Sequence, residues 1–531
     1  MEQRSRVIFY NVHSWTGVLC SILLFVVAFS GTVALFVDEL TQWERPAHRI
    51  DYNAEQPLDL DRLLAPIFDR ADVKTDDIVF LQFPTAYQPT LLAHWHDALT
   101  GEDNEAYINP VTGEILPEES EDFTALLREV HTDLLLPKPW GRYLVGATGL
   151  VMLLSLVTGV IVHHKLFKEL FTFRFERKRR TLWTDLHKIV GIWVLPFHAM
   201  IAFTGMFLGL GALLFMVAAF SAFDGDVDKA AAAVLGETAV AVGEPLGRYS
   251  MNDAYRQYQR DRPENTPHYM IIEAFGDHNE VISVEGGNTG ALVRTVGIKY
   301  RSRDGEVVKV NDQISDSKGP FVRTFFAFTP LHYALYGGLL LKVVYFVLGL
   351  GTCLMMVTGT LIWIERRAQR RRYYPWLSAL TIGVCMGLPI ATLATFWANK
   401  LLPGYSEWPQ RYETIMVVFL VVWALCLAWV FSVRVQPRAI KRLFALMSAL
   451  FLGVPLVNIV ATGYYPWQAL LSNQLPVLVV DIIGLVGALV MGWVSYRLPE
   501  KAPSKSNKPP AELAQTPVVV DQFESPKAIN P

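Results

Sequence analysis

The sequence predicts an all-α polytopic membrane protein with about eight transmembrane helices and two α+β domains outside the membrane. Three observations support this fold class. The 531 residues are 52% hydrophobic and only 18% charged, and the mean hydropathy is positive. Several segments stay apolar over the roughly 20 residues that a helix needs to cross a bilayer. Two long polar insertions interrupt the apolar segments.

The apolar segments give the predicted elements in chain order. The eight spans are expected near 14–37, 141–163, 187–217, 335–364, 374–398, 413–433, 443–465 and 476–496. The corresponding regions are a first transmembrane helix (1–37), a first outer domain (38–138), helices two and three with a basic loop (139–217), a second outer domain (218–330), a fourth helix (331–370), four additional helices without histidine (371–498) and a disordered tail (499–531). The tail is rich in proline, lysine and serine, which is typical of disorder.

Lysine and arginine predict the orientation of the spans. They cluster before the first span, between spans two and three (165–180), after span four (366–372) and between spans six and seven (434–442). All four clusters fall on the same side, and the positive-inside rule makes that side cytoplasmic. Both termini are therefore expected in the cytoplasm, and both large insertions outside it.

The two insertions are expected to fold. The first, 38–138, holds 22 acidic residues against seven basic ones. Each insertion is long enough for a small core and contains a strand–turn–strand pattern, at 107–114 and at 300–307. The Thr-Gly and Asp-Gly dipeptides at the two turns suit positive φ angles.

A histidine repeat is the strongest functional signal. One copy consists of His13, Gly17, Ser30 and Gly31, and the other of His187, Gly191, Thr204 and Gly205, with the same spacing. A second pair consists of His131, before a run that ends in Thr158 and Gly159, and His332, before a run that ends in Thr358 and Gly359. Histidine is costly in lipid and marks a functional site. The glycines either let helices pack closely or leave room for a flat ligand.

The direction of the spans sorts these histidines by depth. His13 and His187 begin outward spans near the cytoplasmic surface, whereas His131 and His332 precede inward spans near the outer surface. Two pairs at two depths predict two b-type haems, each with two histidine ligands to its iron. The absence of a CxxCH motif argues against covalently attached haem.

Two further histidines leave the ligand assignment open. His163, at the cytoplasmic end of span two, competes for the inner site. His198 lies 11 residues after His187, which is three turns along a straight helix, and competes for the outer site. His48 and the other outer histidines are expected at the surface. Lys342 is expected to snorkel, and Asp481 to be a candidate for a proton path or a quinol site.

The tract 13–17, the tract 185–191 and the glycine-containing outer hairpins resemble PepSY-associated transmembrane proteins. The resemblance covers roughly 1–370. It implies two PepSY-like periplasmic domains, a bacterial inner-membrane location and kinship with di-haem ferric-siderophore reductases. Some members carry a fused flavoprotein reductase, and this sequence contains no such domain. Electrons would then come from a separate cytoplasmic or membrane donor, either a flavin reductase or a quinol.

The expected function is therefore transmembrane electron transfer that reduces a ferric siderophore, or another ferric chelate, during iron uptake. One alternative is a non-enzymatic PepSY module that regulates or binds an outer partner. Another is a haem or metal permease. The lipid bilayer is an expected partner, and nucleic acid is not.

Overall fold

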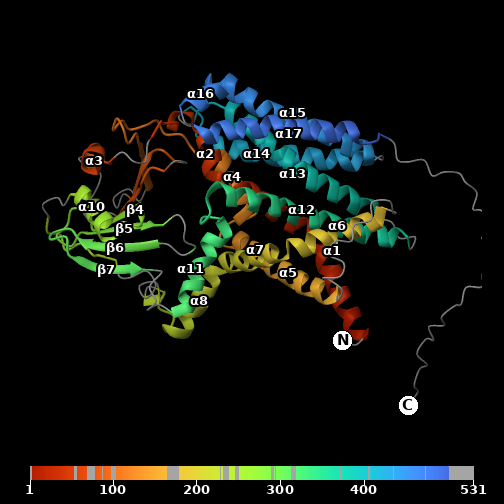
Figure 1. Cartoon of the computed structure of the whole chain (residues 1–531), viewed down its shortest axis with the longest axis horizontal. Coiled ribbons are helices and arrows are strands. Elements are labelled where there is room, and N and C mark those ends of the chain that lie inside the picture. Colours follow the sequence, from red (N-terminus) through yellow and green to blue (C-terminus); the bar gives the residue numbers. More distant parts are fainter. Residues whose placement is uncertain are drawn as a thin grey trace, which may run out of the picture.

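The computed structural model describes a bundle of long helices with a β-sheet at one end (Figure 1). The N-terminus lies at the opposite end of the bundle from the sheet. The description covers residues 3–500 except 53–56, 69–77, 86–87, 97–102, 164–178, 228, 231–237, 246–249, 289–291, 293–294, 313–318, 370–373, 405–406, 434–435 and 473. Most of the basic cluster at 165–180 and nearly all of the predicted disordered tail lie outside the described residues.

The chain is a multi-pass membrane protein. Within the described ranges, the helices long and apolar enough to cross a membrane are α1 (Gln3–Ala34), α5 (Trp140–Val162), α12 (Gly338–Ala368), α13 (Pro375–Leu401), α14 (Arg411–Ser432), α15 (Gln436–Thr462) and α17 (Leu475–Arg497). Their positions agree with seven of the eight spans expected from hydropathy. The bent pair of helices α6 and α7 supplies the eighth candidate.

The third span is broken, which the sequence-based prediction of one helix over 187–217 did not foresee. Helix α6 (Arg179–Trp193) and helix α7 (Leu195–Gly209) meet at an angle of 68°. Pro196, in the first turn of α7, lacks an N–H and its ring collides with the carbonyl one turn earlier, so the helix cannot continue through it. The apolar helix α8 (Gly211–Ala222) follows.

The two insertions share one seven-stranded antiparallel sheet. Its strands, in spatial order, are β3 (Asp103–Ile108), β2 (Leu91–His96), β1 (Val79–Gln82), β4 (Thr266–Glu273), β5 (Val281–Gly287), β6 (Thr295–Arg301) and β7 (Val307–Asp312). The first insertion supplies β1 to β3 and the second β4 to β7. The two sets join where β1 pairs with β4, with Phe80 opposite Ile271.

This pairing joins the two expected outer domains through a single sheet. Helices α3 (Leu60–Phe68) and α10 (Met251–Asp261) come from different insertions, yet their side chains enter one hydrophobic core with all the inner strands. Strand β1 is only four residues long and would expose an unpaired edge without β4. Pairing satisfies that edge and buries apolar residues from both insertions together.

The predicted hairpins differ in outcome. Strands β6 and β7 form the expected hairpin, with Gly305 at φ +70° in its turn. At 107–114, Gly113 has φ +81°, but the chain makes only an isolated bridge from Ile108 to Ile115 after the turn.

Short helices connect the sheet to the spans. They are α2 (Val37–Glu44), η1 (Pro46–His48), α4 (Asp122–Thr132) and α11 (Gly319–Tyr333), and a further short helix, α16 (Pro466–Leu471), connects α15 to α17. Helices α4 and α11 each stand directly before a long apolar helix, α5 and α12, and a residue with positive φ follows each of them, Leu134 and Ala334 respectively. These two helices occupy equivalent places in the two halves of the repeat.

Candidate functional site

The structure brings the four repeat-matched histidines together as two pairs. His13 on α1 faces His187 on α6, with 6.4 Å between the ring centroids. His131 on α4 faces His332 on α11, with 6.1 Å between the ring centroids. Each pair joins one histidine from each half of the chain, as the repeat suggested.

A second contact fixes the orientation of each ring through its Nδ1 atom. His13 Nδ1 lies 2.8 Å from the carbonyl oxygen of Ser155, and His131 Nδ1 lies 2.9 Å from that of Val27. His187 Nδ1 lies 3.1 Å from the Met355 carbonyl oxygen. In the part of the chain that the structure describes, no hydrogen bond engages Nε2 of any of these rings. The Nδ1 proton therefore goes to the backbone acceptor and the Nε2 lone pair is left for a ligand.

His332 is held in a slightly different way. Its Nδ1 atom lies 2.9 Å from Oγ1 of Thr204, which also donates a hydrogen bond to the Met200 carbonyl oxygen at 2.8 Å. Thr358 occupies the equivalent place beside His187, where its Oγ1 lies 3.2 Å from Nδ1. In the second half of the repeat, Thr204 and Thr358 thus each lie next to one ring.

The glycine of each Ser/Thr-Gly dipeptide packs directly against one imidazole ring. A Cβ atom at Gly31 would lie 2.5 Å from Cε1 of His131, and one at Gly159 would lie 3.1 Å from Cε1 of His13. The corresponding distances are 3.0 Å from Gly205 to His332 and 3.2 Å from Gly359 to His187. The sequence alone left open whether these glycines serve packing or a ligand, and it did not reveal that each glycine packs against one histidine ring. The recurring spacing was the signal, because each glycine accompanies one histidine.

Helix α1 separates the two pairs along its own axis. His13 belongs to the first pair. Gly31, 18 residues further along α1, packs against the ring of His131 in the second pair. At about 1.5 Å per residue this spacing corresponds to about 27 Å. The hydrocarbon core of a bilayer is about 30 Å thick, so the pairs lie at two depths near opposite faces.

The spacing within each pair fits a metal ion between two imidazole nitrogens. Two metal–nitrogen bonds of about 2 Å, plus roughly 1 Å from each nitrogen to its ring centre, require about 6 Å between the centroids. Among the described residues, no group of three or more His, Cys, Asp or Glu side chains could hold a metal ion. A two-histidine site suits a metal whose remaining ligands come from a macrocycle, as in haem. The two histidine pairs therefore fit haem.

Burial favours the neutral form of both rings in the pair of His131 and His332. Burial lowers the pKa of His131. Burial, with a smaller effect from His131, lowers the pKa of His332 to about 3. Neutral imidazole is the form that binds iron, so both rings are ready to act as ligands without first losing a proton.

The two competing histidines are not members of either pair. His163 is the C-terminal capping residue of α5, and its backbone N–H donates to the Gly159 carbonyl oxygen at 3.1 Å. His198 lies beyond the 68° bend between α6 and α7, so it is not three straight turns from His187 as expected, and its assignment to the outer site stays a prediction. Its side chain is completely buried, and neither ring nitrogen has a hydrogen-bond partner among the described residues.

Two other sequence-based expectations, for Lys342 and His48, are corrected, whereas the proton path or quinol site at Asp481 stays a prediction. Lys342 does not snorkel to water, because it is buried and its Nζ lies 3.0 Å from the Glu39 carboxylate on α2. Asp481 is held by Trp43, whose Nε1 donates to it at 3.1 Å, and therefore ties α17 to α2. His48 is buried rather than exposed, and its Nε2 lies 2.9 Å from the Pro117 carbonyl oxygen.

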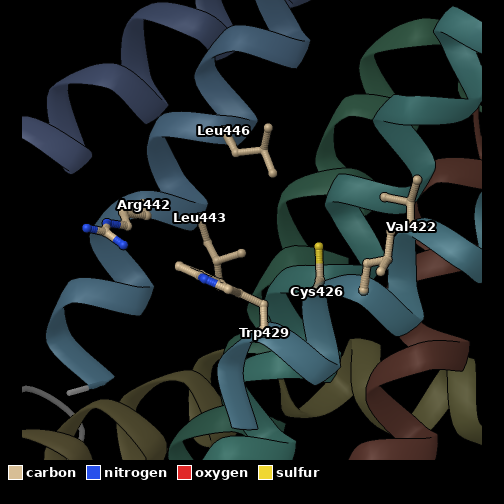
Figure 2. Close-up of a pocket in the computed structure, with 7 residues that line it drawn as sticks. Val422, Cys426, Trp429, Arg442, Leu443 and Leu446 are labelled. Carbon is tan, nitrogen blue, oxygen red and sulfur yellow. The ribbon is translucent and has the colours of Figure 1, made fainter. Parts of the chain in front are cut away.

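A separate cavity of about 350 Å³ lies between α14 and α15 (Figure 2). Its lining consists of Val422, Leu425, Cys426, Trp429, Arg442, Leu443 and Leu446. The histidine pairs come from α1, α4, α6 and α11, so this cavity is not part of the paired-histidine site.

Comparison with known proteins places the two pairs within one family region. Residues 10–366 match the family described as "PepSY-associated TM region". This stretch contains all six candidate histidines and ends within α12. The chain is also 29% identical over 399 residues to the uncharacterized protein PA4219 of Pseudomonas aeruginosa, which covers 70% of this chain and 95% of that protein.

Proposed function

The chain belongs to the family of PepSY-associated transmembrane proteins, and on this basis we propose that it is a di-haem b-type electron-transfer protein of the bacterial inner membrane. In this proposal it takes electrons on the cytoplasmic side and reduces a ferric chelate, such as a ferric siderophore, in the periplasm. The observation that carries the proposal is the pair of histidine pairs at two depths, each with the spacing of a two-imidazole iron site.

The roles of the residues follow from their contacts. His13 and His187 would hold the inner haem, and His131 and His332 the outer one. The backbone acceptors Ser155, Val27 and Met355 orient the rings and make each Nε2 atom a better donor to the metal. When bound, haem supplies reversible one-electron reduction of its iron.

The position of the sheet supports a periplasmic substrate. Both insertions lie at the end of the bundle that carries α4 and α11, and therefore beside the outer pair (Figure 1). One electron converts Fe(III) in a chelate to Fe(II). The softer, less charged ion binds hard oxygen ligands more weakly, so the iron is released. The electron comes from a cytoplasmic flavin reductase or a membrane quinol in this proposal.

The test is an absorption spectrum of the purified full-length protein together with quantitation of its haem. We expect a reducible, low-spin b-type spectrum and two haems per chain. A colourless preparation would contradict the proposal and favour a regulatory PepSY module. A single exchangeable haem in variable amount would instead favour a permease.

A further inference from the structure

Helices α13 to α17 lie beyond the family region and contain no histidine, because His332 is the last in the chain. We propose that α13 and α14 hold α4 in place and thereby set the position of His131 at the outer haem. Glu44, Arg411 and Tyr412 are the positioning residues. The inference rests on the proposed function. It assigns the positioning of His131 to residues that lie outside the histidine pairs.

The N-terminus of α4 is capped from outside. The buried Glu44 carboxylate, on α2, accepts hydrogen bonds from the backbone N–H of Phe123 at 2.7 Å and of Thr124 at 3.1 Å. These first-turn N–H groups have no partner within their own helix. Asn399, on α13, donates to the same carboxylate at 2.8 Å. The cap of α4 is thus tied directly to α13.

Arg411, the first residue of α14, links the first residue of α4 to the C-terminal end of α13. Its Nε atom donates to Oδ2 of Asp122 at 2.7 Å, and both side chains are buried. Its Nη1 atom donates to the carbonyl oxygens of Leu402 and Pro403, between α13 and α14, at 3.1 and 2.6 Å. The planar guanidinium fork satisfies these acceptors from different elements together.

Tyr412 contacts α4 close to the histidine itself. Its hydroxyl group donates to Oε2 of Glu129, two residues before His131. Apolar contacts extend the same interface, since Leu126 and Val130 share a hydrophobic cluster with Ile415 on α14.

Helix α4 also contacts α1, where His131 meets the Val27 carbonyl oxygen and Gly31. Helix α4 is therefore clamped between α1 and the additional helices. The ring has little room to adjust by itself, because a backbone acceptor and a helix surface confine it. A change at the α14 side of α4 must consequently move His131 relative to His332.

The experiment compares Tyr412→Phe, Arg411→Lys and Arg411→Met in the full-length, haem-loaded protein. Tyr464→Phe is the matched control, because Tyr464 bonds Ser472 at the same end of the additional helices and makes no hydrogen bond to α4 among the described residues. Electron paramagnetic resonance and redox titration report each haem separately. The outer haem is identified as the component lost in His332→Ala.

We expect Tyr412→Phe and Arg411→Met to shift the low-spin signal and the reduction potential of the outer haem, with the inner haem unchanged. Arg411→Lys should retain more of the native signal, and Tyr464→Phe all of it. A merely stabilising role would lower the unfolding temperature and leave both haem signals in place, which would overturn the inference. If Arg411→Met does not fold, Tyr412→Phe decides the question alone, since it removes one oxygen atom. Wild-type protein without haem would contradict the proposed function itself, and the inference with it.

Discussion

At the scale of single residues, the site depends on small side chains as much as on the histidines. Each ring lies against a helical glycine, and three of the four rings bond a backbone carbonyl oxygen of the residue four positions before that glycine. Helix surfaces usually present side chains there. Glycine exposes the backbone, so the ring can approach closely enough to bond it. The Ser/Thr-Gly dipeptide is thus one half of a ligand site whose other half is a distant histidine.

Replacing Gly31 by alanine tests this role. The new methyl group would lie 2.5 Å from Cε1 of His131, whose ring is fixed by its bond to Val27. Such overpacking costs about 1–3 kcal/mol and displaces the ring. We expect Gly31→Ala to lose the outer haem, measured as loss of half the haem absorbance. Gly17→Ala, on the same helix and facing open space, should keep the full absorbance. Equal haem content in the two variants would show that haem binding does not require glycine next to His131.

At the scale of secondary-structure elements, the bend in the third span determines which residues meet. Helix α6 brings His187 to α12, and α7 leaves at 68° to bring Thr204 and Gly205 to His332 on α11. A straight span could not serve both places. The short helices α4 and α11 position His131 and His332 in the same way in both halves, because each directly precedes a long apolar helix.

This arrangement predicts different behaviour for the paired and unpaired histidines. His163→Ala and His198→Ala should keep two low-spin haems, because neither residue lies in a pair. The four variants His13→Ala, His131→Ala, His187→Ala and His332→Ala should each lose about half of the haem absorbance or make one iron high-spin. Haem quantitation and the spin state in a single purification series measure this. Retention of both haems in all four would show that the pairs are not the ligands.

At the scale of the whole molecule, the shared sheet fixes the topology. Strand β1 belongs to the first insertion and β4 to the second, and they pair along the whole length of β1. Both insertions must therefore lie on one side of the membrane. The sequence predicted the same arrangement independently, from the four basic clusters on the other side.

Reporter fusions test the topology directly. Fusions at Asp97 and Asn288 should both report the periplasm, and a fusion at Arg177 the cytoplasm. The first two must agree with each other because the sheet unites their insertions. Opposite signals from Asp97 and Asn288 would contradict the sheet, whereas a cytoplasmic signal from both would reverse the proposed direction of electron flow.

The direction of electron flow makes a further prediction about substrates. Chemically reduced protein should be reoxidised by at least one ferric siderophore. His131→Ala and His332→Ala should slow this reaction about tenfold or more, because they remove ligands at the sheet end. His278→Ala, an outer histidine beside Arg303, is the matched control and should react at the normal rate. Protein that holds both haems but reacts with no ferric chelate would point to another periplasmic oxidant.

The sequence by itself determined the spans, the membrane class and the four histidines that come together. These features are periodic or compositional: hydropathy marks the spans, and the repeat marks His13, His131, His187 and His332. It did not determine the bend at Pro196, the single sheet or the burial of Lys342 against Glu39. Each of these is a choice of partner between segments far apart in the chain. Only the tertiary structure decides such choices. An edge strand, a buried charge and an exposed glycine backbone each need a partner, and packing determines which distant segment supplies it.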